Sequence, residues 1–126
     1  MVRWSDVAAT GAPGQVVCAD ALPWLRERGV IADACAITSL PDVSKVGMAL
    51  PSGRRWFEEA TRLVIDAVPA ESAAVFFQSD IKRDGEWIDK GQLVLRTAEA
   101  AGARVLFHKI VLQRPAGMLT GGRVVK

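Results

Sequence analysis

The chain has 126 residues, of which 50% are hydrophobic and 24% charged, and its formal net charge is +2. This length fits one domain that buries a core without disulfides, and the composition is typical of a soluble globular protein. No apolar run approaches the roughly 18 to 20 residues of a membrane span, and the first residues lack the apolar core of a signal peptide. We therefore expect an intracellular, cytoplasmic protein without a membrane segment, and the small positive charge favours anionic partners only weakly.

The first half of the chain predicts a strand, helix, strand unit. The apolar run 15–19 indicates a buried strand, and Asp20 is a suitable N-cap for a short helix over 21–28 that Gly29 closes. A second buried strand is expected over 33–38.

Two further helices and two further strands follow. A loop from 40 to 53 leads into a helix over 53–68, capped by Ser52, whose apolar residues recur at helical spacing. The elements expected after it are a strand over 72–78, a charged connection over 81–87, a helix from the capping box of Asp89 and Gln92 to 101, and a last strand over 103–113.

Strands that alternate with helices in this order predict an α/β fold. We expect a Rossmann-like three-layer sandwich with a mostly parallel sheet over 15–113, preceded by a flexible arm (1–14) and followed by a loop-rich tail (114–126). Cys18 and Cys35 lie in apolar strand-like runs, where buried reduced thiols are expected, and their spacing supports neither a disulfide nor a metal site.

The sequence Ser39-Leu40-Pro41-Asp42 ends the predicted second strand in a polar turn. Proline has no N–H to donate and restricts the residue before it, so the chain must leave the sheet here. In open α/β sheets, ligands bind beyond the carboxyl ends of the strands, which makes this turn the first candidate site. The alternative is that Ser39 and Asp42 only hydrogen-bond within the turn.

Two short motifs resemble S-adenosylmethionine-dependent methyltransferases of the Rossmann-like class. The run Val16 to Leu22 is similar to the strand of that family that ends in an acidic residue beside the adenine of the cofactor, and the run Ala36 to Asp42 falls where nucleic-acid amino-methyltransferases carry their Pro-containing motif. The order of these parts resembles the permuted type. The Gly-rich cofactor loop of the family is not found, which implies an incomplete methyltransferase fold or a fragment.

The resemblance implies that Ser39, Leu40, Pro41 and Asp42 are catalytic, because a nitrogen nucleophile must lose a proton and be held in line with the methyl group. Asp42 stands where the family has an aromatic ring, and a carboxylate cannot stack on a base, so its expected role is that of a general base or a cation-binding group. Asp20 and Ala21 would lie beside S-adenosylmethionine. The residues assigned to substrate binding are Gln78, Ser79, Asp80, Arg54 and Arg55.

Four further side chains have candidate roles that are less specific. Lys82 and Arg83 are candidates for phosphate contacts, Trp87 for a stacking face, and His108 for a hydrogen-bonded structural residue rather than a catalyst.

The function expected from the resemblance is S-adenosylmethionine-dependent methylation of a DNA or RNA base. The alternative is a catalytically inactive methyltransferase-like module that binds a partner or forms a homodimer through an uncovered sheet edge.

Overall fold

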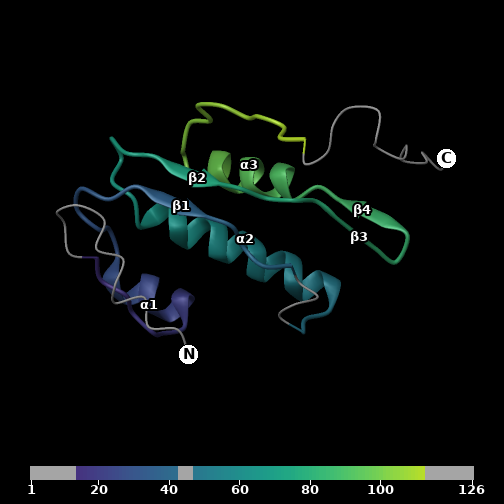
Figure 1. The fold of residues 1–126 in the computed structure, drawn as a ribbon, viewed down its shortest axis with the longest axis horizontal. Coiled ribbons are helices and arrows are strands. Elements are labelled where there is room, and N and C mark those ends of the chain that lie inside the picture. Colours follow the sequence, from purple (N-terminus) through teal and green to yellow (C-terminus); the bar gives the residue numbers. More distant parts are fainter. Residues whose placement is uncertain (1–13, 43–46, 113–126) are drawn as a thin grey trace.

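The computed structural model describes residues 14–42 and 47–112, and it shows a mixed α/β arrangement (Figure 1). The arm expected over 1–14 lies outside these ranges except for Gly14, and the tail expected over 114–126 lies outside them entirely. The elements found in the described ranges are α1 (Ala21–Arg28), β1 (Ala36–Thr38), α2 (Leu50–Asp66), β2 (Ala74–Phe76), β3 (Ile81–Arg83), β4 (Glu86–Ile88) and α3 (Lys90–Ala100). No helix in the described ranges is long and apolar enough to cross a membrane.

The strands form two separate pairs. β1 and β2 are parallel, with Ile37 opposite Val75, as expected for strands joined through a helix. β3 and β4 form an antiparallel hairpin that extends past the carboxyl end of that pair (Figure 1). The mixed α/β class is therefore established, whereas the three-layer sandwich is not confirmed.

Helices α2 and α3 lie on one side of the parallel pair. They contact each other directly, and two helices on opposite faces of a sheet would be held apart by the sheet itself. The small core lies between them and the strands, and its buried members include Phe57, Ala60, Ile88 and Val94. Ile37, whose side chain lies on the other face, is 79% exposed, so that face of the sheet is open within the described residues.

The three predicted helices are confirmed, because their start and stop signals are local. The Asp20 carboxylate accepts a hydrogen bond from the Leu22 N–H (3.2 Å), and Asp89 accepts one from the Gln92 N–H (2.7 Å). α2 begins at Leu50, earlier than the expected Gly53, with Ala49 rather than Ser52 at its N-cap. Pro51 makes this possible, since its fixed φ suits the first turn, where no N–H is needed.

Three predictions about strands are wrong. No strand forms over 15–19 or over the described part of the predicted strand 103–113, and the connection over 81–87 is a hairpin. The hairpin had a local sequence signal, the dipeptide Asp84-Gly85. Both residues have positive φ (53° and 82°), as a two-residue hairpin turn requires. The two segments are apolar enough to form buried strands, but a strand forms only where the edge of a neighbouring strand pairs with it.

The prediction of buried cysteines is also wrong, because Cys18 and Cys35 are both exposed. Cys18 lies in the segment that forms no strand, and Cys35 precedes β1. Burial of either thiol needs sheet and helix layers that the described residues do not provide.

Candidate functional site

The carboxyl ends of β1 and β2 bring the predicted turn and the predicted substrate residues together. The turn Ser39–Asp42 follows β1, and residues 78–80 follow β2. The pairing continues past the strands, since the Phe77 N–H donates to the Thr38 carbonyl at 2.9 Å. The sequence prediction that these two polar segments share one rim is therefore confirmed.

Gln78 extends the pairing with its side chain. With the amide oriented so that both of its atoms are satisfied, the nitrogen donates to the Leu40 carbonyl (3.2 Å) and the oxygen accepts from the Leu40 N–H (2.6 Å). These two bonds take the place of the next rung of the ladder. Gln78 thus fixes the backbone of the turn, and its amide is occupied there instead of facing a substrate.

Asp42 pairs with a lysine that sequence reasoning missed. The Asp42 carboxylate forms an ion pair with Lys90 Nζ, and the side chains of Asp42 and Lys90 are only 21% and 6% exposed. Lys90 is the first residue of α3, where the helix dipole disfavours a cation. A lysine directly after an Asp N-cap was therefore a usable signal that a carboxylate from elsewhere in the fold compensates it.

Asp80 joins the same cluster through both of its oxygens. Its Oδ1 accepts from the Lys90 backbone N–H (3.0 Å) and its Oδ2 accepts from Trp87 Nε1 (3.2 Å). The expected substrate-binding residue thus caps α3 and orients an indole ring. We name the group Asp42, Asp80, Trp87 and Lys90 the rim cluster.

Two serines remain exposed at this rim. Ser39 lies in the turn after β1 and Ser79 in the segment after β2, and both face solvent. They are the predicted site residues whose hydroxyls are accessible to a ligand.

The two predicted arginines lie at different places, and only one of them is near the turn. Arg54 lines a small gap of about 10 Å³ together with Lys90 and Ile81, which is room for no more than about one water molecule. Arg55 donates to the Ser52 hydroxyl (3.4 Å) and lines a different, open groove between α2 and α3. Only Arg54 lies near the rim cluster.

Asp20 and Ala21 belong to another part of the molecule. Both are exposed at the start of α1, where the Asp20 carboxylate is used as a cap. α1 packs against α2: Arg26 forms an ion pair with Glu59 in the middle of that helix, and just after α1 the Ile31 N–H donates to the Ala67 carbonyl (2.8 Å). Lys90 lies instead beside the first turns of α2, among Leu50, Gly53 and Phe57.

The remaining candidate, His108, lies beside the first turn of α3. A side chain at Gly91 would place its Cβ 3.6 Å from His108 Nε2, so glycine leaves room for the ring. Across the described ranges, no group of three or more His, Cys, Asp or Glu side chains could hold a metal ion.

The turn gives a first prediction. Replacing Gln78 with alanine removes both bonds to the Leu40 backbone, and since a hydrogen bond contributes about 1 kcal/mol net, we expect the Leu40 amide to exchange about fivefold faster or more. Amide hydrogen exchange followed by NMR measures this. Gln92→Ala, at an exposed position of α3, is the control and should leave Leu40 unchanged. Unaltered protection of Leu40 in Gln78→Ala would contradict the assigned role.

Comparisons of the chain with protein-family models, with curated proteins and with solved structures found no match.

Proposed function

We propose that the chain is an S-adenosylmethionine-dependent methyltransferase that acts on a DNA or RNA base, with its described residues on the substrate side. The observation that carries the proposal is the rigid turn Ser39–Asp42, which Gln78 and Lys90 fix at the carboxyl end of a parallel strand pair. That is the position where open α/β sheets present ligands, and a methyl acceptor must be held there in one orientation.

The contacts of the turn divide the roles among its residues. Ser39 is exposed, so its hydroxyl is free to hydrogen-bond the nitrogen of the acceptor. The Leu40 carbonyl accepts one bond from Gln78 and keeps a second lone pair, and Pro41 stiffens the chain beside it. Asp42 is engaged with Lys90, so in this proposal it positions the turn and is not the general base.

The cofactor fits the described residues less well. A ligand of that size needs a pocket of roughly 300 Å³ or more. The gap beside Lys90 holds about one water, and the open groove between α2 and α3 is lined by neither Asp20 nor Ala21. The described residues alone therefore do not enclose S-adenosylmethionine, and the proposal assigns them to the substrate side.

A methyl-transfer assay on the full chain tests the proposal. With S-adenosylmethionine labelled in its methyl group and pools of DNA or RNA, we expect label in nucleic acid and at least a tenfold slower transfer for Ser39→Ala. Ser72→Ala, at another exposed serine, is the matched control and should transfer at the rate of the unaltered chain. A calorimetric titration with S-adenosylmethionine accompanies the assay. Absence of both S-adenosylmethionine binding and methyl transfer in the full chain would reject the proposal.

A second candidate function is favoured by the open face of the sheet. Ile37 and Phe77 are exposed there. Such surfaces mark interaction sites. Because the exposed residues Cys35, Ile37 and Phe77 carry no charge, this face is complementary to itself, and we propose a second copy of the chain as its partner.

Sedimentation distinguishes this module from a monomeric enzyme. A dimer is expected for the unaltered chain, and Ile37→Lys should shift it to a monomer without unfolding it, since the side chain is already in solvent. Lys82→Ile, an exposed change on the hairpin, is the control. A monomer at all concentrations rejects the module.

A further inference from the structure

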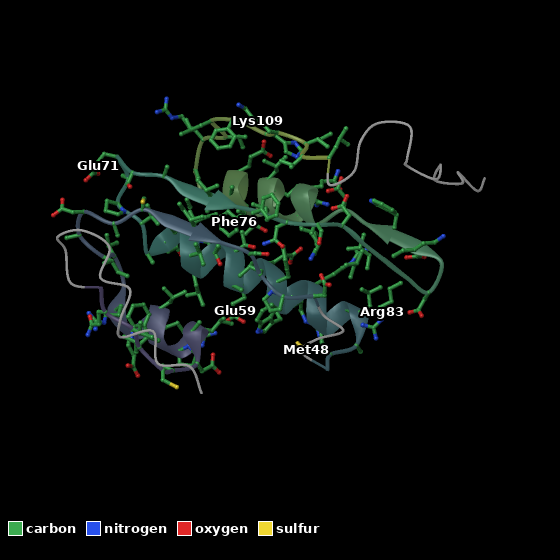
Figure 2. The ribbon with its side chains drawn as sticks, viewed as in Figure 1. Met48, Glu59, Glu71, Phe76, Arg83 and Lys109 are labelled. Atoms are coloured by element: carbon green, nitrogen blue, oxygen red, sulfur yellow. The ribbon has the colours of Figure 1, made fainter. Side chains whose placement is uncertain are left out.

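The hairpin of β3 and β4 has two different sides. Ile81 and Ile88 pair on the inner side, where Ile88 is buried against α2. Lys82 and Trp87 pair on the outer side, and both are exposed. Figure 2 shows Arg83 beside Met48, whose carbonyl accepts from the guanidinium at 3.5 Å, so the hairpin is also tied to the segment before α2.

Trp87 is both exposed and fixed. The residue is 67% exposed, yet its Nε1 donates a hydrogen bond to Asp80 Oδ2 at 3.2 Å. Asp80 is itself held by the Lys90 backbone N–H. A large apolar ring in water is unfavourable, and here it is also kept from turning toward the core. The ring therefore has a constant direction and an accessible surface, which lowers the entropic cost of binding a flat ligand.

The ring lies at the same end of the molecule as the predicted turn. Asp80 bonds both Trp87 and the backbone of Lys90, and the Lys90 ammonium pairs with Asp42. A chain of contacts thus joins the indole to the turn. Asp42 offers no stacking surface, whereas Trp87 provides one in the same cluster.

The charges of the hairpin select the kind of ligand. Lys82 and Arg83 are balanced by Asp84 and Glu86, and Arg83 is occupied by Met48 and Asp84. A surface that binds along a nucleic-acid backbone needs a positively charged groove, and the hairpin does not provide one. It suits a neutral planar ring that stacks on the indole.

We propose that Trp87 is a stacking platform for a single nucleobase presented at the rim. The inference rests on the proposed function, since it supplies the base contact that the turn lacks. Stacking on an aromatic side chain is tolerant of base identity, so one unpaired base of either DNA or RNA fits the surface.

Fluorescence anisotropy with a labelled single-stranded deoxyadenosine decamer tests the proposal. Trp87→Ala should weaken binding at least about fivefold, Trp87→Phe less than about twofold, and Phe107→Ala, which removes an exposed ring from the segment after α3, not at all. An abasic decamer, which has phosphates but no bases, should bind more weakly than the deoxyadenosine decamer and equally to the unaltered chain and Trp87→Ala. Circular dichroism verifies that each variant is folded.

The outcomes separate this inference from the proposed function. Equal affinity of Trp87→Ala and the unaltered chain for the deoxyadenosine decamer overturns it, as does failure of the unaltered chain to bind. Trp87-dependent binding of the decamer, with neither S-adenosylmethionine binding nor methyl transfer, supports the platform and rejects the methyltransferase. Methyl transfer with an unchanged KM in Trp87→Ala rejects the platform and keeps the methyltransferase.

Discussion

Replacing Asp42 with alanine should lower the free energy of unfolding by about 3 kcal/mol, because it leaves the Lys90 ammonium buried without its counterion. The lysine side chain is only 6% exposed, and it begins a helix whose dipole is unfavourable to a cation. Neither effect is relieved by solvent as long as Lys90 stays in place. Urea unfolding followed by circular dichroism measures the loss.

The matched controls separate the charge from the contact. Lys90→Met keeps most of the apolar stem and leaves Asp42 at a more exposed position, so it should cost less than Asp42→Ala. The double variant Asp42→Ala with Lys90→Met should recover part of the loss, since no unpaired charge then remains buried. A loss below about 1 kcal/mol in Asp42→Ala would show that the pair behaves as a solvated surface pair and does not fix the turn.

The helices could be predicted because their information is local. Asp20 and Asp89 each bond an N–H within the next three residues, and Gly102 has a positive φ (77°) directly after α3. The strands were less predictable. The segments 15–19 and 103–113 are as apolar as 72–78, yet only the last contains a strand in the described residues, because pairing depends on an edge that a local pattern does not contain.

The candidate site was predicted in its place but not in its contacts. Pro41 and the polar residues around it located the turn, and parallel pairing brought Gln78 beside it. Sequence reasoning gave Gln78 and Asp80 to a substrate, whereas the structure uses them to hold Leu40 and α3. These contacts join residues distant in sequence, and only the fold brings them together.

Phe57 is the largest hydrophobic side chain in the described core. It is 2% exposed, and it lies in α2 where the helix meets the inner side of the hairpin at Ile88 and the start of α3 at Leu93. Few other side chains in residues 14–42 and 47–112 are as deeply buried, so the packing of helix, hairpin and rim depends on this one ring.

Phe57→Ala is therefore expected to cost about 3 to 5 kcal/mol of unfolding free energy, which combines lost burial with the cavity that remains. Domains of this kind are stable by only about 5 to 15 kcal/mol, so the melting temperature should fall by about 10–20 °C. Thermal and urea unfolding measure both quantities. The same substitution at Phe107, which is 60% exposed, should change stability by less than about 1 kcal/mol. Equal losses at the two positions would show that the ring of Phe57 does not organise the core, and that the rim cluster is held by other contacts.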